Sequence, residues 1–184
     1  MFEQDVELIG GPEHREIQLV PYDPSWSEKF KSEQQKITTA LGAKALRVDH
    51  IGSTSVRGLI AKPIIDIQLS VDDPDNEGEY LPELEQQGYV LRVRQKGHRM
   101  VRTPELDFQV HICKTGSDWE RRHLLFRDWL RHDKDDRRAY ADLKERLAKQ
   151  DWETMNHYAD AKGKVIRELT KRAEAWAAET DWQP

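Results

Sequence analysis

A glycine and three hydroxyl residues stand shortly before an acidic strand in this chain of 184 residues. In the stretch DHIGSTSVRGLIAKPIIDIQLSV, Ser53 follows Gly52 directly, and twelve residues separate Ser53 from Asp66. Glycine lets the backbone approach a phosphate closely, and hydroxyls with amides at the start of a short helical turn bind anions. The pattern therefore predicts a phosphate-binding turn. Its expected contacts are Gly52, Ser53, Thr54 and Ser55.

The acidic strand after this turn offers ligands for a cation. Asp66 and Gln68 are two residues apart, so in a strand both side chains lie on one face. A carboxylate and an amide oxygen are both ligands that Mg²⁺ accepts, although only the carboxylate brings a negative charge. The strand therefore predicts one Mg²⁺ or Mn²⁺ site beside the turn.

A later strand, LDFQVHI, is expected to supply a third ligand. Asp107, Gln109 and His111 share one of its faces. Asp107 and His111 stand about 13 Å apart at the rise of a strand, so only one of them can join Asp66. A histidine that is simply hydrogen-bonded within the sheet explains His111 equally well, and both interpretations stay open.

Two lysines could also meet a phosphate. Lys62 precedes Pro63 and would act either as a point charge on phosphate or as a solvated loop residue. Lys162 interrupts an apolar stripe between Tyr158 and Ile166, so its charge must reach either the surface or a cleft. From the residues alone, both alternatives remain open for Lys62 and for Lys162.

Hydrophobic periodicity predicts an α+β protein in which a sheet comes first and helices come last. Ser25 with Glu28 is typical of a helix-start capping box, and the same pattern recurs at Ser117. A hairpin is expected around Gly10. The expected strands lie within residues 6–20, 44–52, 63–71, 89–94, 98–103 and 106–112, and the expected helices within 25–41, 80–87 and three segments after 117. The segments at 89–112 should form an antiparallel meander, and 63–71 should be central.

Composition narrows the class of protein. The formal net charge is −5, so no general attraction to nucleic acid or to an anionic membrane is expected. We expect a cytoplasmic protein without membrane partners, because no apolar run reaches the length of a membrane span and the N-terminus has no signal-peptide pattern. The single cysteine, Cys113, excludes an intramolecular disulfide. No P-loop or nucleophile-elbow motif is present.

Several motifs, in order along the chain, resemble the GrpB family of the nucleotidyltransferase superfamily. They are VPYDPSW, DHIGSTSV, GLIAKPIIDI, GHRMVRT, HLLFRDWLR and MNHYADAK, spanning about residues 15–176. The resemblance implies a nucleotidyltransferase-like mixed sheet with helices on one side and a helical C-terminal region. Relatives in this family commonly carry histidine at position 111, and some are fused to dephospho-CoA kinase. The chain departs from the superfamily pattern at Gln68, where an acidic residue is typical, and at Arg57, which is expected to point into water.

These observations together predict one domain, residues 1–184, with a sheet-bearing part at 1–115 and a helical part at 116–184. The leading hypothesis is a Mg²⁺-dependent enzyme that transfers a nucleoside monophosphate from an NTP to an unidentified acceptor. Its expected catalytic and metal-binding residues are Asp66, Gln68 and His111, and its expected nucleotide contacts are Gly52, Ser53, Thr54, Ser55 and Lys62. The alternative is an accessory module that binds nucleotide with weakened or no turnover. Metal-dependent hydrolysis around Asp66 and His111 is a third, weaker possibility.

Overall fold

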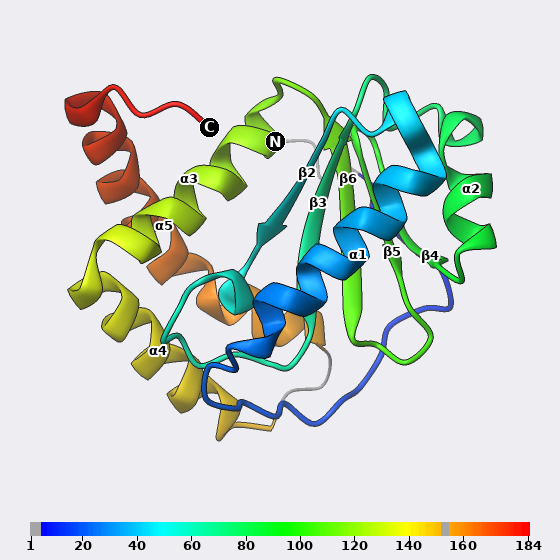
Figure 1. Cartoon of the computed structure of the whole chain (residues 1–184). Coiled ribbons are helices and arrows are strands. Elements are labelled where there is room, and N and C mark those ends of the chain that lie inside the picture. The colour runs from blue at the N-terminus through cyan, green and yellow to red at the C-terminus, as the bar shows by residue number, and fades with distance from the viewer. Residues whose placement is uncertain (1–4, 152–154) are drawn as a thin grey trace.

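The computed structural model describes residues 5–151 and 155–184 and has a mixed sheet beside a group of helices (Figure 1). Six strands pair in the order β1-β4-β5-β6-β3-β2. The strands are β1 (Glu7–Leu8), β2 (Arg47–Ile51), β3 (Ile65–Val71), β4 (Val90–Gln95), β5 (His98–Arg102) and β6 (Phe108–Lys114). The α-helices are α1 (Ser25–Leu41), α2 (Leu81–Gln86), α3 (Asp118–His132), α4 (Lys134–Ala148) and α5 (Met155–Thr180). The predicted α+β class is therefore confirmed.

The sheet has one parallel pair in an otherwise antiparallel arrangement. Strands β4, β5 and β6 form the predicted antiparallel meander, and β3 pairs in parallel with β6 and antiparallel with β2. Strand β3 is thus an interior strand, as predicted. Its register places Asp66 beside Gln109 and Gln68 beside His111.

The two faces of β3 differ in chemistry. Ile65, Ile67, Leu69 and Val71 are buried in an apolar core that also contains residues of α1 and α2, such as Ile37 of α1. Burial of these side chains provides the main favourable contribution to folding of this layer. The opposite face carries Asp66, Gln68 and Ser70, of which Asp66 is partly exposed whereas Gln68 and Ser70 are buried.

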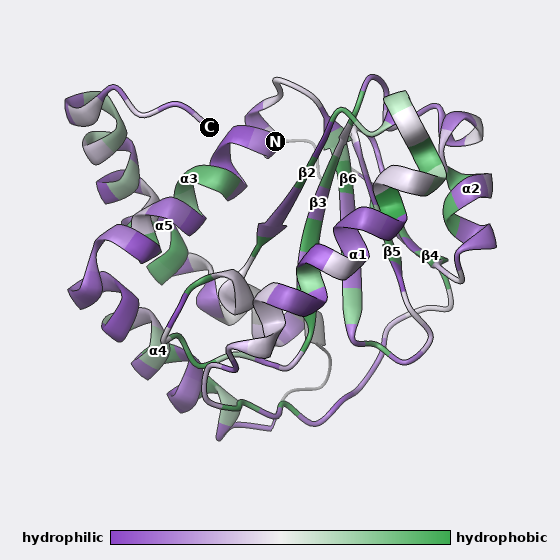
Figure 2. Cartoon of the chain, viewed as in Figure 1, coloured by the Kyte–Doolittle hydropathy of each residue, from purple (hydrophilic) through white to green (hydrophobic). Residues whose placement is uncertain are grey.

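The C-terminal helices pack beside the β2 edge of the sheet, where α3, α4 and α5 enclose a second apolar core (Figures 1 and 2). Leu130, Leu143 and Leu169 contribute to this core from the three helices in turn. The turn between β2 and β3 adds Val56 and Leu59 to the same core. The segment that carries the glycine and hydroxyl residues is therefore fixed between the sheet and the helices.

Three local predictions have different outcomes. Ser117 caps α3, since its Oγ accepts a hydrogen bond from the amide of Glu120 at 3.3 Å. The capping box at Ser25 is wrong, because the side chain of Asp23 accepts the hydrogen bond from the Ser25 amide instead. Within the described residues, no helix is long and apolar enough to cross a membrane.

The predicted hairpin around Gly10 is also wrong. Only β1 forms a strand there, and it pairs with β4 rather than with the segment that follows it. Val20 instead makes an isolated bridge with Ala61. The guanidinium of Arg92 donates hydrogen bonds to the carbonyls of Ile9 and Gly11, which holds this segment against β4. Long-range contacts thus replaced the local hairpin.

Candidate functional site

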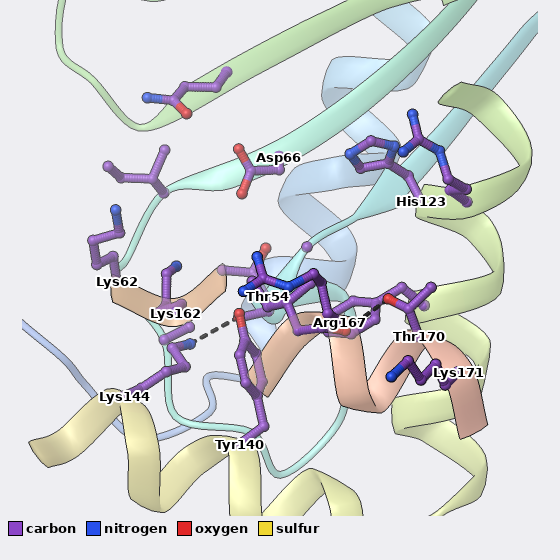
Figure 3. Close-up of a pocket in the computed structure, with 18 residues that line it drawn as sticks. Thr54, Lys62, Asp66, His123, Tyr140, Lys144, Lys162, Arg167, Thr170 and Lys171 are labelled. Atoms are coloured by element: carbon purple, nitrogen blue, oxygen red, sulfur yellow. Dashed lines mark hydrogen bonds between the residues drawn. The ribbon is translucent and has the colours of Figure 1, made fainter. Parts of the chain in front are cut away.

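A cavity of about 670 Å³ lies between the polar face of β3 and the C-terminal helices (Figure 3). Its lining comes from the β2–β3 turn, β3, β6 and all three C-terminal helices. The lining residues include Gly52, Ser53, Thr54, Lys62, Asp66, Gln109, Arg122, His123, Tyr140, Lys144, Lys162, Arg167 and Lys171. Segments far apart in the sequence therefore contribute to one site.

The turn at Gly52 and the carboxylate of Asp66 are in close contact. Gly52 has φ +70°, a conformation that side-chain-bearing residues rarely adopt. A Cβ atom at Gly52 would lie 2.7 Å from Oδ2 of Asp66, so the backbone needs glycine for space as well as for conformation. The chain thus brings the predicted phosphate turn directly against the predicted metal ligand.

The three hydroxyl residues form a short 3-10 helix, Ser53–Ser55, and have different partners. Ser53 Oγ accepts a hydrogen bond from Lys144 Nζ at 2.8 Å, and Thr54 Oγ1 lies 2.9 Å from Nε2 of His50. Ser53 and Thr54 line the cavity. Ser55 is buried, and its hydroxyl donates to the carbonyl of Gly52. Two of the hydroxyl residues therefore face the site, whereas Ser55 stabilises the turn.

His111, and not Asp107, reaches Asp66. The Nε2 atom of His111 lies 3.4 Å from Oδ1 of Asp66. Asp107 instead accepts a hydrogen bond from the Thr103 hydroxyl at 2.6 Å. The two candidates are thus distinguished by geometry, and Gln109 lies beside Asp66 in the parallel register and lines the cavity.

A second histidine stands behind His111. Nε2 of His98 lies 3.2 Å from Nδ1 of His111, and the His98 ring stacks on Trp119 with centroids 4.0 Å apart. Burial lowers the pKa of His98 to about 3, so this imidazole is neutral at pH 7. His111 is therefore held between a carboxylate and a neutral ring.

Gln68 lies on the same face as Asp66 but outside the cavity lining. Its side chain is fully buried beneath α3, where Nε2 donates to the carbonyl of Glu120 at 3.2 Å. The structure therefore brings Gly52 and Ser53 to the cavity that Asp66 lines, places His111 against Asp66 but outside the cavity lining, and buries Gln68 beneath α3. Its predicted role as a metal ligand stays a prediction.

Three lysines occupy one end of the cavity, from three different elements (Figure 3). Burial lowers the pKa of Lys144 to about 7 and that of Lys162 to about 8, and it also lowers the pKa of Lys62. Neighbouring lysines add to the shifts of Lys144 and Lys162. The charge of Lys162 therefore reaches a cleft rather than the surface. Lys62 is a partly buried cavity residue rather than a solvated one.

Other cations lie along the rim of the cavity. Arg122, Arg167 and Lys171 are exposed there. His123 also lines the cavity, but burial lowers its pKa to about 4, so it is neutral at pH 7. Among the described lining residues Asp66 is the single acidic side chain. The cavity is consequently cationic although the chain as a whole is acidic.

Lys144 was not among the predicted site residues, although the sequence contained a signal for it. It falls one helical turn after Tyr140, within the apolar stripe of α4 that Leu143 and Leu147 continue. A lysine on a buried stripe is the same anomaly that singled out Lys162. Arg57, by contrast, is exposed, as predicted.

The donor set suits one Mg²⁺ better than two. No group of three or more His, Cys, Asp or Glu side chains in the described part of the chain is arranged to hold a metal. Mg²⁺ is commonly held by one or two carboxylates while substrate phosphates and water supply its other ligands. Asp66 could fill this role beside the turn. A second ion would have no carboxylate of its own among the lining residues that the structure describes.

Comparisons of the chain with known proteins identify its family. Residues 16–172 match the GrpB protein family. The chain belongs to the GrpB family. UPF0157 protein SCO7215 of Streptomyces coelicolor is 50% identical over 170 residues, covering 92% of this chain and 91% of that protein. The crystal structure of the conserved protein GrpB from Enterococcus faecalis is 32% identical with a TM-score of 0.76, covering 86% of this chain and 99% of that one.

The chain also matches part of a longer protein that is named as a kinase. Dephospho-CoA kinase of Mycolicibacterium paratuberculosis is 30% identical over 197 residues, and the match covers 91% of this chain but 48% of that protein. A GrpB-like region therefore makes up about half of that kinase polypeptide.

Proposed function

We propose that this GrpB-family cavity binds the polyphosphate of a nucleotide and transfers the nucleoside monophosphate to an acceptor. The observation that supports this most is the contact between the Gly52 turn and Asp66 within an otherwise cationic cavity. Phosphoryl and nucleotidyl transfer depend mainly on positioning and on neutralising phosphate charge. The Asp66 carboxylate would bind the metal ion, and the cationic side chains around it would bind the phosphates.

Each part of the chain has a distinct role in this proposal. The Gly52–Thr54 turn holds the phosphates near Asp66, and Lys144 fixes the turn through its hydrogen bonds to Ser53 Oγ and the carbonyl of Ile60. His111 orients the Asp66 carboxylate. A Mg²⁺ ion bound through Asp66 would neutralise phosphate charge and align the attacking oxygen with the leaving pyrophosphate. Gln68 is retained as a supporting residue behind Asp66.

Labelled NTPs test the proposal directly. We expect the wild-type protein, supplied with Mg²⁺ and a metabolite extract, to label an acceptor and release pyrophosphate. Asp66→Asn should reduce labelling at least about 100-fold, the scale seen when one group that stabilises the transition state is removed. Asp72→Asn is the matched control, because Asp72 is exposed beyond the end of β3. Equal background labelling in all three proteins would reject transfer.

A specific observation favours a second candidate, a module that binds nucleotide without turnover. Position 68 carries an amide instead of a second carboxylate and lies outside the cavity lining, so Asp66 is the one carboxylate among the described lining residues. The half-length match to a dephospho-CoA kinase is consistent with such an accessory role. Saturable NTP binding that depends on Lys162 and produces no labelled acceptor would support this second candidate over transfer.

A further inference from the structure

The buried end of the cavity has an unbalanced cluster of charges. Nζ of Lys62 and Nζ of Lys162 lie 5.4 Å and 4.8 Å from the centroid of the Tyr158 ring. Nζ of Lys144 lies 5.5 Å from the Tyr140 ring centroid, on the adjoining wall. The aromatic faces attract these ammonium groups but do not cancel their charge.

The charge imbalance indicates what the cluster binds. Among the described residues, three lysines face one carboxylate, Asp66, which is the acidic group that raises the pKa of each of them. Buried cations are costly unless they are paired, and a lysine relieves that cost by losing its proton. Full protonation of the cluster therefore leaves about two positive charges to be balanced, which is the charge of a terminal phosphate.

We propose that Lys62, Lys144 and Lys162 form a subsite for the dianionic terminal phosphate of the ligand, and that the subsite takes up protons as this anion enters. The proposal extends the function proposed above by assigning the direction in which the nucleotide lies. Its terminal phosphate is directed toward the lysines, and the nucleoside lies toward the apolar wall and rim. Phe126 and Ile166 belong to that wall.

Proton uptake follows from the state of the empty site. With pKa values of about 7 and 8, Lys144 and Lys162 together lack about one proton per chain at pH 7.5. A bound dianion stabilises the ammonium forms and raises both pKa values, so protons are taken from solvent. In the part of the chain that the structure describes, the titratable and charged groups that face the cluster are Asp66 of β3, His123 of α3, Tyr140 of α4, Tyr158 of α5 and Arg15 of the N-terminal segment.

The neighbouring histidine and tyrosines do not supply the expected proton exchange. His123 has a pKa of about 4, and burial raises the pKa of Tyr140 and of Tyr158 above the usual range of tyrosine. The lysines of the cluster are consequently the groups to which we assign the charge change, and Lys144 and Lys162 have pKa values of about 7 and about 8.

Sulfate is the appropriate probe for this proton, because it remains a dianion near neutral pH and releases no proton of its own. We expect sodium sulfate to raise the pH of a weakly buffered solution of the full chain at pH 7.5, with saturation near one proton per chain. Sodium chloride at the same ionic strength controls for screening. Binding of sulfate without proton uptake, release of protons, or absence of sulfate binding would each overturn the proposal.

Two lysines of α5 provide a matched pair of variants. Lys162→Gln should weaken sulfate and ATP binding at least tenfold and reduce proton uptake. Lys164→Gln removes an equal charge from an exposed position of the same helix and should leave both unchanged. Melting temperatures verify that both variants fold, and Lys62→Gln, from a different element, repeats the test if Lys162→Gln is unstable. Equal effects of Lys162→Gln and Lys164→Gln would contradict a specific subsite.

The direction of the nucleotide is tested with a ligand that has no terminal phosphate. ATP should bind at least tenfold more tightly than diadenosine tetraphosphate, in which every phosphate is internal. Equal affinity would overturn the assigned direction. These binding experiments use neither acceptor nor turnover. Anion binding with proton uptake but no labelled product would therefore reject transfer alone, whereas transfer without proton uptake would reject the subsite alone.

Discussion

Asp66 and Gln68 lie two residues apart on the same face of β3, yet their surroundings differ in access, charge and hydrogen bonding. The Asp66 side chain is 30% exposed, beside a glycine turn and a cationic cavity. Gln68 is fully buried beneath α3, and its Oε1 has no hydrogen-bond partner among the described residues. The start of α3, and not the chemistry of the strand, therefore decides which polar residue can meet a ligand.

The end of this β3 face that carries Gln68, called the closed end below, is polar but has no access to the cavity. Glu120 Oε2, His98 Nδ1 and Trp119 Nε1 are also buried there without partners in the described part of the chain. Unpaired buried polar atoms cost folding free energy. The open end carries a different cost, in the left-handed glycine and the desolvated lysines. Both ends lower the folding stability of the protein, but a ligand can reach and stabilise only the open end.

The largest expected effect is that of a new charge at the closed end. Gln68→Glu should lower the free energy of unfolding by about 3 kcal/mol at pH 7, because a carboxylate without a cationic partner would be buried there. The folded-state pKa of this glutamate would be raised above its unfolded value, so the loss should shrink as pH falls toward 5. Urea unfolding at the two pH values measures this change.

Gln68→Leu is the matched control for that variant. It removes the unpaired Oε1 together with the hydrogen bond to Glu120, so the net change should stay within about 1 kcal/mol. A Gln68→Glu protein as stable as the wild type would show that this end is open to solvent or to a cation. The contrast drawn between the two positions would then be wrong.

The same contrast explains how far the sequence could predict the site. Periodicity placed β3 in the interior, and it placed Asp66 and Gln68 on one face, because those properties follow from local spacing. Which of the two lies under α3 depends on packing between elements about 50 residues apart in sequence, as the contact from Gln68 to Glu120 illustrates. Local spacing contains no information about such contacts.

The N-terminal segment and the lysines show the same division. The expected hairpin at Gly10 did not form because Arg92, far along the chain, binds the segment instead. Lys62 was predicted through its place in a motif, whereas Lys144 was missed because helical apolar spacing was attributed to core packing alone. Charged residues on apolar stripes were informative at both positions in the helices, since both line the cavity.

The next effect concerns the open end. Gly52→Ala should cost about 2 kcal/mol of folding stability, from positive φ and from a Cβ atom 2.7 Å from the Asp66 carboxylate. It should also displace Asp66 and weaken nucleotide binding. Gly58→Ala is the matched control, because Gly58 has φ +81° in the same loop but nothing within 4 Å of the added Cβ. Its cost should be about 1 kcal/mol, without loss of binding.

Urea unfolding and ATP titration of both glycine variants measure these two effects separately. The difference between them isolates the close contact from the conformational strain that the two positions share. If Gly58→Ala weakened ATP binding as much as Gly52→Ala, the contact with Asp66 would have no special role.

The smallest expected effect is a gain of stability at the open end. Lys162→Met should raise the free energy of unfolding of the empty protein by about 1 kcal/mol at pH 7, because it removes a desolvated ammonium. The pKa of Lys162 is about 8 in the folded chain and higher in the unfolded chain, so the unfolded state binds more protons between these values. Wild-type stability therefore recovers as pH rises through that range, and the advantage of the variant should decline from pH 7 to pH 10.

Lys164→Met, at an exposed position, should show neither the gain nor its pH dependence. A destabilised Lys162→Met protein would mean that the ammonium is already paired in the empty cavity, and the two ends of the polar face would then differ in access but not in unbalanced charge.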